Sequence, residues 1–410
     1  MRLASGLHHK SLFMVLLYLL LMTIPGEFYF NFFGIRMELY RLFLLVAFLF
    51  YVPVLFKFKR FGAIEYFLLS YCVWSFFSFF VNHGVSGFKS SIILYLEVFV
   101  GYFLGLSIGG SAKKFKRVLF CIAFFYILVA PLAIFETQSG YRITHVFFAE
   151  ILGNPVESYL GDSYYRHGLH RASTVFSHPI LYSVCAVVFI PIFFVFNKSL
   201  KAFFLSSGIF IAMIASVTSV GFLMVFLQFM LYILGLISKF YKKIFTHVVW
   251  FSSLLFLFLS VASNRGPVVL FVNTMSLNPG TAYFRYLQWQ FSTDDVMANP
   301  FFGIGFYEWS RPHWMPISID NFWLMTALQN GIPAFVFLIL FFIFSCRRHW
   351  FSWRSSGESF YFAFFASIFS IIFAAFTVDF FDRAQLVVFL LLGFCNSFLT
   401  EHKRKVGVRL

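Results

Sequence analysis

Long apolar runs constrain the fold of this chain more than any other feature. Runs of about 17–22 residues recur along most of the sequence, and an α-helix of this length crosses about 30 Å of hydrocarbon. Of the 410 residues, 60% are hydrophobic and only 11% are charged, which excludes an ordinary soluble domain. The sequence therefore predicts an all-α polytopic membrane protein that forms a single membrane domain over residues 1–410.

About twelve transmembrane helices are predicted. They are expected near residues 11–25, 42–56, 62–81, 91–109, 118–135, 179–196, 202–217, 220–237, 246–262, 321–345, 359–377 and 385–400. The first run lacks a small-residue cleavage site, so we interpret it as a retained helix. The five cysteines lie in spans or at a cytoplasmic edge without a CxxC or Cys/His pattern, which predicts neither an outer disulfide nor a metal site.

The net charge of +15 orients the chain in the membrane. If both termini are cytoplasmic, the inside segments hold 21 of the 31 Lys and Arg residues beside two acids, and the outside segments hold ten bases with twelve acids. Enrichment of Lys and Arg on the cytoplasmic side is the positive-inside pattern. The excess charge therefore needs no acidic partner, and we expect no binding to nucleic acid.

Two long connections face outward in this topology, residues 136–178 and 263–320. Loops of this length without low complexity are usually functional, so we expect the active-site region there. Nine of the ten outer bases are arginines: Arg36, Arg41, Arg142, Arg166, Arg171, Arg265, Arg285, Arg311 and Arg383, beside Lys89. A guanidinium fork grips phosphate oxygens in two places. The alternative is that these arginines pair with the twelve outer acids.

The stretch "RHGLHRASTVFSHP" leads directly into a predicted span. Pro179 suits the first turn of a helix, which places His178 or Ser177 at the cap. His178 either satisfies only this cap or also donates to a phosphate or a sugar. Arg171 lies so close to the span entrance that its charge is costly unless an anion pairs with it.

The second outer connection contains "TAYFRYLQWQF" around Arg285, which is typical of an amphipathic segment at the membrane interface. Gly303 and Gly305 then permit a tight turn. Asp320 and Asn321 precede an apolar run, where either residue is a normal helix cap. Because a helix N-terminus itself favours anions, we interpret Asp320 as a general base or as a residue that orients a sugar hydroxyl.

The order of these motifs resembles that of the O-antigen polymerase and ligase superfamily, most of all its exopolysaccharide polymerases. The resemblance spans roughly residues 130–335. It is carried by Glu136, Ser139-Gly140-Tyr141-Arg142, Arg166, Arg171, His178-Pro179, Arg285, Asn299-Pro300, Gly303-Ile304-Gly305, Asp320-Asn321 and Gly331.

The resemblance implies a multi-pass protein of the bacterial inner membrane. Such enzymes are metal-independent glycosyltransferases without a cofactor that act in the periplasm on glycans carried by undecaprenyl pyrophosphate. We expect a direct, inverting displacement, with membrane lipid, a flippase and a chain-length regulator as further partners. The expected binding residues are Arg142, Arg166, Arg171, Arg285 and Asn321, and the candidate bases are Asp320, His313 and His178.

Two alternatives to a polymerase stay open. A ligase of the same superfamily transfers finished glycan to a lipid or protein acceptor, but many ligases carry a histidine where this chain has Asp320, and His313 lies seven residues earlier. The second alternative is a lipid-linked glycan flippase or another transporter. A proton-coupled carrier would depend on a membrane acid such as Glu97, because transporters place charge at the midplane.

Overall fold

The computed structural model describes residues 2–32, 34–57, 62–108, 110–196, 200–262 and 279–406. These residues are mostly helical, and the only sheets among them are two short antiparallel hairpins. The hairpins are β1 (Tyr29–Phe32) with β2 (Ile35–Glu38), and β3 (Tyr165–Arg166) with β4 (Leu169–His170). The expectation of a helical chain is therefore confirmed.

The helices follow the predicted apolar segments. Their bounds are α1 (Arg2–Leu21), α2 (Leu39–Lys57), α3 (Ala63–His83), α4 (Gly87–Leu94), α5 (Gly101–Leu106), α6 (Ala112–Ser139), α7 (Ile143–Leu152), α8 (Pro179–Val187), α9 (Ile190–Phe196), α10 (Leu200–Ala215), α11 (Ser219–Phe240), α12 (Ile244–Ala262), α14 (Pro279–Ala298), α15 (Phe322–Ser356), α16 (Ser359–Ala374) and α17 (Asp382–Val406). Short turns of other helix types are η1 (Gly84–Ser86), the π-helix η2 (Tyr95–Val100) and η3 (Asp162–Tyr164).

Seven helical segments in the described part are long and apolar enough to cross a membrane. They are Ala63–Leu106, Ala112–Ser139, Pro179–Phe196, Ser219–Phe240, Ile244–Ala262, Phe322–Ser356 and Asp382–Leu399. The fold is thus that of a helical membrane protein. Further apolar helices are shorter, including Leu12–Leu21, Leu39–Leu49, Phe203–Ala215 and Ser359–Ala374. The count of twelve spans stays a prediction.

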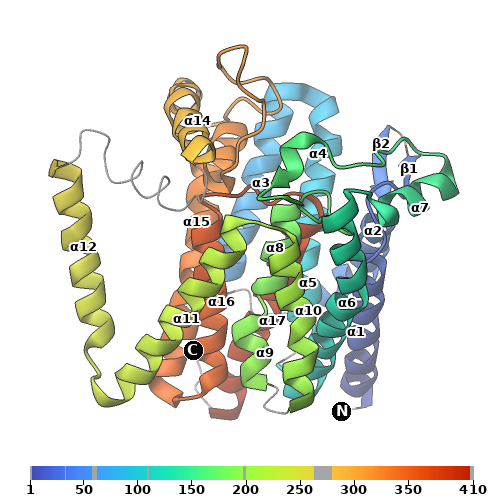
Figure 1. Ribbon diagram of the computed structural model, residues 1–410. Coiled ribbons are helices and arrows are strands. Elements are labelled where there is room, and N and C mark those ends of the chain that lie inside the picture. Colours follow the sequence, from blue (N-terminus) through green and yellow to red (C-terminus); the bar gives the residue numbers. More distant parts are fainter. Residues whose placement is uncertain are drawn as a thin grey trace.

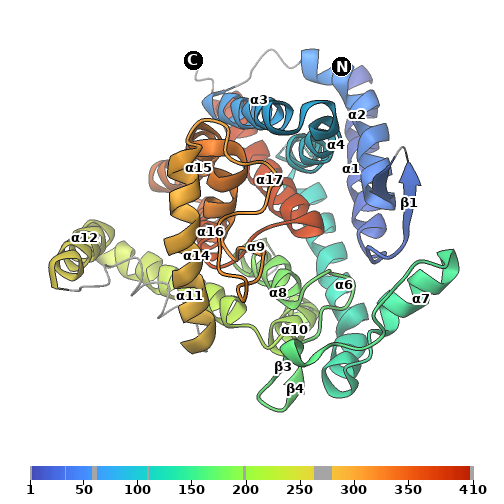
Figure 2. The ribbon, with the colours of Figure 1, turned by 90° about the horizontal axis from the view of Figure 1, so that it is seen from above.

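Helices α7 and α14 and the β1–β2 hairpin gather at one end of the bundle, at the top of Figure 1. We call this the loop end. Figure 2, seen from this side, shows α14 beside α15, against which it packs. Both predicted outer connections contain helical structure, because α7 lies within residues 136–178 and α14 within residues 263–320.

One predicted boundary shifts in the structure. Helix α6 continues past Glu136 to Ser139 and ends at Gly140, whose φ of 69° is left-handed. Glu136 is therefore a helix residue, only 1% exposed, rather than the first residue of a loop. Its carboxylate accepts hydrogen bonds from the backbone N–H groups of Ser173 and Thr174, at 3.1 and 2.9 Å. This interaction ties the end of α6 to the segment that follows Arg171.

Helix α15 is kinked at Gly331, which has φ 83° and ψ 168°. The segment from Pro300 to Gly305 packs into this kink: Ile304 N–H donates to the Leu328 carbonyl at 2.8 Å, and Ile332 N–H donates to the Pro300 carbonyl at 2.7 Å. A Cβ atom on Gly331 would lie 2.1 Å from the Phe301 carbonyl oxygen. The kink therefore requires glycine, and it fixes the connection between α14 and α15 to the bundle.

Candidate active site

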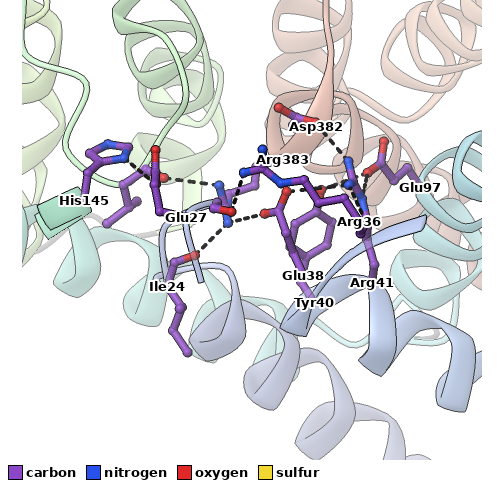
Figure 3. Close-up of polar contacts among 12 residues, drawn as sticks. Ile24, Glu27, Arg36, Glu38, Tyr40, Arg41, Glu97, His145, Asp382 and Arg383 are labelled. Carbon is purple, nitrogen blue, oxygen red and sulfur yellow. Dashed lines mark hydrogen bonds and ion pairs between the residues drawn. The ribbon is translucent and has the colours of Figure 1, made fainter. Parts of the chain in front are cut away.

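Several arginines at the loop end are already paired with acids. The Arg41 guanidinium contacts the Glu97 carboxylate at 2.8 Å and the Asp382 carboxylate at 2.9 Å, and Arg383 pairs with Glu38 (Figure 3). We call these five residues the paired network. It joins α2, η2 and the start of α17, and four of its members are buried. Each arginine of this network has a carboxylate partner within the protein, so the network serves the fold.

Arg142 is also engaged within the protein. Its Nη2 lies 3.8 Å from the Glu27 carboxylate, which also contacts His145 Nδ1 at 2.6 Å. Burial alone would raise the pKa of Glu27, but the hydrogen bond and charge of His145 lower it to about 2. A cavity of about 30 Å³, close to the size of one water, separates Arg142 from Tyr164. The structure thus places Arg142 with Glu27, and Arg142 is not among the groups that act electrostatically on Arg171, His178 or Arg285.

The other arginines that are expected to bind substrate lie near carboxyl groups. Together these residues come from three parts of the chain. We call this set the open cluster: Arg166, Arg171, His178, Arg285, Asp320 and Asp379. Its members lie within electrostatic range of one another, because Asp320 acts on both Arg171 and Arg285, and Arg166 acts on both arginines and on His178. Both long connections therefore contribute to one site.

Arg171 is held by the backbone on both sides. Its own N–H donates to the Tyr164 carbonyl at 2.9 Å, and Ala172 N–H donates to the Ala215 carbonyl at 3.0 Å, at the end of α10. The side chain is only 4% exposed. Its Nε lies 3.5 Å from the Ser216 carbonyl, and its Nη2 is buried without a hydrogen-bond partner. The guanidinium is thus fixed in place with donors unused.

Arg285 enters the same site from α14. It too is 4% exposed, and its Nη2 donates to the Thr377 carbonyl at 3.0 Å. Thr377 belongs to residues 375–381, the connection between α16 and α17, which we call the floor segment. The Nε and Nη1 atoms of Arg285 are buried without partners. Arg285 therefore also keeps donors free for a ligand.

Arg171 and Arg285 in the open cluster lack the carboxylate partners that Arg41 and Arg383 have in the paired network. In the described part of the chain, neither Arg171 nor Arg285 forms an ion pair with a carboxylate. Burial and the neighbouring Arg166 lower the pKa of Arg171 to about 10, although Tyr164 and Asp320 oppose this change. Burial likewise lowers the pKa of Arg285, against the effect of Asp320. An anion with several oxygens would relieve both cations.

At the start of α15, Asp320 and Asn321 have different roles. Asn321 is the cap: its Oδ1 accepts from Leu324 N–H at 3.0 Å, and its Nδ2 donates to the Phe376 carbonyl at 3.0 Å. The Asp320 N–H donates to Gln288 of α14 at 3.1 Å. Within the described residues, the Asp320 carboxylate takes part in no hydrogen bond or ion pair that competes with a substrate. Asp320 is therefore available as a base, whereas Asn321 is occupied by the fold.

His178 caps α8, as the sequence predicts. Its Nδ1 accepts from Ile180 N–H at 3.2 Å. Burial lowers the pKa of His178 to about 3, and the charges of Arg171 and Arg166 act in the same direction. The ring is therefore neutral near pH 7, and its proton is on Nε2 because Nδ1 accepts. This geometry favours the role of hydrogen-bond donor to a substrate over that of base.

Asp379, on the floor segment, was missed as a site residue in the sequence. Burial raises its pKa to about 7, and the charges of Asp320 and Asp382 add to this effect. Its sequence context, "FTVDFFDR", holds no motif. The only signal in the sequence is that this acid lies between two apolar spans, on the side of the membrane where the other candidate residues are expected. The sequence could not reveal that this acid approaches Asp320.

Besides Arg142 and Asn321, the candidate base His313 is also not part of the open cluster. His313 is exposed on the connection between α14 and α15, and in the described residues no contact joins it to the cluster. Arg265 lies outside the described residues. Within the part of the chain that the structure describes, no group of three or more His, Cys, Asp or Glu side chains is arranged to hold a metal ion.

Comparison of the sequence with protein-family models and with curated proteins gives no match. The site is therefore interpreted from its geometry alone. It combines two fixed, partly unpaired guanidinium groups, a neutral imidazole donor and two carboxyl groups at one end of a membrane-spanning bundle. Chemically, such a site can bind a diphosphate and accept a proton from a nearby hydroxyl group.

Proposed function

We propose that this chain is a polysaccharide polymerase, a metal-independent inverting glycosyltransferase of the bacterial inner membrane. It joins oligosaccharide repeat units carried by undecaprenyl pyrophosphate, in O-antigen or exopolysaccharide synthesis. In this proposal the chain has twelve spans, both termini are cytoplasmic, and the loop end faces the periplasm. Lipid-linked oligosaccharide, flippase and chain-length regulator are its expected partners.

One observation carries this proposal: Arg171 and Arg285 are buried at the same site, and neither has an acidic partner within the described residues. Keeping such cations in the fold is unfavourable unless a ligand compensates them. A lipid-linked diphosphate has the required charge and several acceptor oxygens, and it reaches a site at the end of a membrane bundle without leaving the bilayer. Arg41 and Arg383, which are paired, supply the contrast within the same protein.

In the proposed reaction the acceptor sugar hydroxyl attacks the anomeric carbon of the donor. A new glycosidic C–O bond forms while the bond from the anomeric carbon to the diphosphate oxygen breaks. The electron pair leaves with the lipid diphosphate, where Arg171, Arg285 and Arg166 stabilise the charge. The hydroxyl proton passes to the Asp320 carboxylate. His178 Nε2–H donates to a phosphate or sugar oxygen. Direct displacement inverts the anomeric centre.

The test is the glycan chain length in cells that carry Arg171→Ala, Arg285→Ala or Asp320→Ala. Each arginine is expected to contribute about 2–4 kcal/mol of transition-state stabilisation, so its loss lowers polymer formation about 30- to 1,000-fold. Arg311→Ala is the matched control, because this arginine pairs at 3.1 Å with the exposed Glu308. Normal polymer from all three site variants would contradict the proposal.

A ligase would use the same diphosphate chemistry, and product analysis separates the two. A polymerase gives longer chains, and cells without it accumulate a lipid carrier with a single repeat unit. A ligase gives a capped acceptor. Asp320, in the position where many ligases have histidine, favours the polymerase.

A transporter would use Glu97, whose carboxylate accepts hydrogen bonds from Arg41 and from the Tyr40 hydroxyl, both at 2.8 Å. A proton carrier would need this acid to be free to titrate, and it would tolerate the loss of Arg171.

A further inference from the structure

A deep groove lies on the side of the bundle between α9, α11 and α16. Its volume is about 730 Å³, within the range of about 300–1,000 Å³ that is usual for small-molecule sites. Its walls are mainly apolar and include Phe194, Val225, Phe229 and Phe362. Phe194 and Phe229 are 40% and 55% exposed, so the groove opens sideways, toward the lipid in a membrane-spanning protein.

The groove is distinct from the open cluster. It extends along α11 to Lys239, one residue before this helix ends, and along α16 from its first residue, Ser359. The other ends of these two helices lead to Ser216 and the floor segment, where Arg171 and Arg285 are held. The groove therefore extends toward the end of the bundle opposite the loop end, and the lower half of Figure 1 shows this end of α11.

The polar groups of the groove are concentrated at this opposite end. Lys239 is the one charged side chain among the lining residues that the structure describes, and it is exposed. Trp353 lines the groove near it. Lysine and tryptophan are the side chains that anchor at the level of lipid headgroups. Lys242 and Lys243 follow in the turn between α11 and α12 and add positive potential.

We propose that this groove binds an anionic phospholipid from the leaflet opposite the loop end, with an acyl chain along α11 and the phosphate on Lys239. Apolar walls match an acyl chain, and a cation without an acid among its lining neighbours matches a phosphate rather than a zwitterionic headgroup. The bound lipid fills the space between α9, α11 and α16 and thus completes the packing of the helices beneath the open cluster. This site is independent of the proposed glycosyltransferase reaction.

The test is native mass spectrometry of the full-length protein, extracted in mild detergent and titrated with phosphatidylglycerol, phosphatidylethanolamine or polyprenyl phosphate. Wild-type protein should retain one phosphatidylglycerol in preference to phosphatidylethanolamine. Lys239→Gln should weaken phosphatidylglycerol binding roughly fivefold. Lys239→Arg should preserve it, and Val225→Trp should block the groove. Lys242→Gln is the matched control, because it removes the same charge from a residue that does not line the groove, and it should leave binding unchanged.

Three outcomes would overturn the proposal. Equal loss in Lys239→Gln and Lys242→Gln would indicate general attraction of anionic lipid. Equal retention in Lys239→Gln and wild type would exclude the phosphate contact. Displacement of phosphatidylglycerol by an equimolar amount of polyprenyl phosphate would assign the groove to an isoprenoid chain instead. The Lys239 variants decide the question even if Val225→Trp does not fold, because Lys239 is exposed and its replacement leaves no cavity in the core.

Discussion

Replacing Arg171 with methionine should make the protein more stable while abolishing its proposed activity. Burial lowers the pKa of Arg171 from 12.5 to about 10, which corresponds to about 3 kcal/mol of folding free energy lost in keeping the cation charged. Methionine removes this penalty but also the contact with the Ser216 carbonyl at 3.5 Å, which contributes about 1 kcal/mol or less. The expected net gain is about 2–3 kcal/mol.

The effect has a defined pH dependence. The folded protein holds the Arg171 proton less tightly than the unfolded chain does, because its pKa is about 10 rather than 12.5. The penalty is therefore fully present below pH 10, including neutral pH, and it disappears as the pH rises toward 12.5. Wild type and Arg171→Met should differ most in stability at neutral pH.

Thermal unfolding in detergent micelles, followed by tryptophan fluorescence, measures this difference. We expect the midpoint of Arg171→Met to rise by a few degrees. Arg383→Met is the matched control: the same substitution removes a buried arginine that pairs with Glu38, and it should destabilise by about 3–5 kcal/mol. At a hundredfold excess over its Kd, inorganic pyrophosphate should stabilise the wild type by about 2.7 kcal/mol and so raise its unfolding midpoint. The midpoint of Arg171→Met should not change.

Two results would refute this reasoning. If Arg171→Met is destabilised as strongly as Arg383→Met, the Arg171 cation is compensated within the fold and the site has no need of an anion. If pyrophosphate stabilises both proteins equally, it binds elsewhere.

The same contacts give expected results for four other substitutions. Asp320→Asn should leave the unfolding midpoint near that of wild type and lower polymer formation at least about 100-fold. Asn321→Ala should lower the stability by about 1–2 kcal/mol in thermal unfolding, because the helix cap is lost. The pKa of Asp379 is raised to about 7 in the folded protein, so its protonated carboxyl group contributes stability that is fully present below the unfolded pKa of 3.8 and is lost as the pH rises through 7. Asp379→Asn should therefore flatten the decrease in the unfolding midpoint between about pH 5 and 8. Gly331→Ala should destabilise by about 3 kcal/mol or more in denaturation assays, because φ is 83° and the new Cβ would lie 2.1 Å from the Phe301 carbonyl oxygen.

The cap of α8 was narrowed to His178 or Ser177 from the neighbouring residues alone, and the structure shows it to be His178. Pro179 at the first helical position and the apolar run that follows are local signals, and the structure has His178 Nδ1 accepting from Ile180 N–H. The cap at the start of α15 was narrowed to two residues but not resolved. Which of Asp320 and Asn321 caps the helix depends on the floor segment, because the Phe376 carbonyl binds the Asn321 amide.

The two classes of arginine could not be separated from sequence. Arg41 and Arg171 both lie near a predicted span and both are buried, yet Arg41 finds Asp382, 341 residues away, and Arg171 finds no acid among the described residues. The same limit applies to Asp379, whose approach to Asp320 depends on the packing of α16, α15 and α14. Sequence spacing contains none of these distances.

The apolar length that crosses a bilayer and the residues that cap a helix are local properties, so they identify a helical membrane protein from the amino-acid order. Which polar groups are compensated depends instead on tertiary contacts. The energy of a charge depends on the acids, dipoles and burial around it, and helix packing supplies these from distant parts of the chain. That packing pairs Arg383 with Glu38 and leaves Arg285 without an acidic partner among the described residues, and this difference marks the candidate active site.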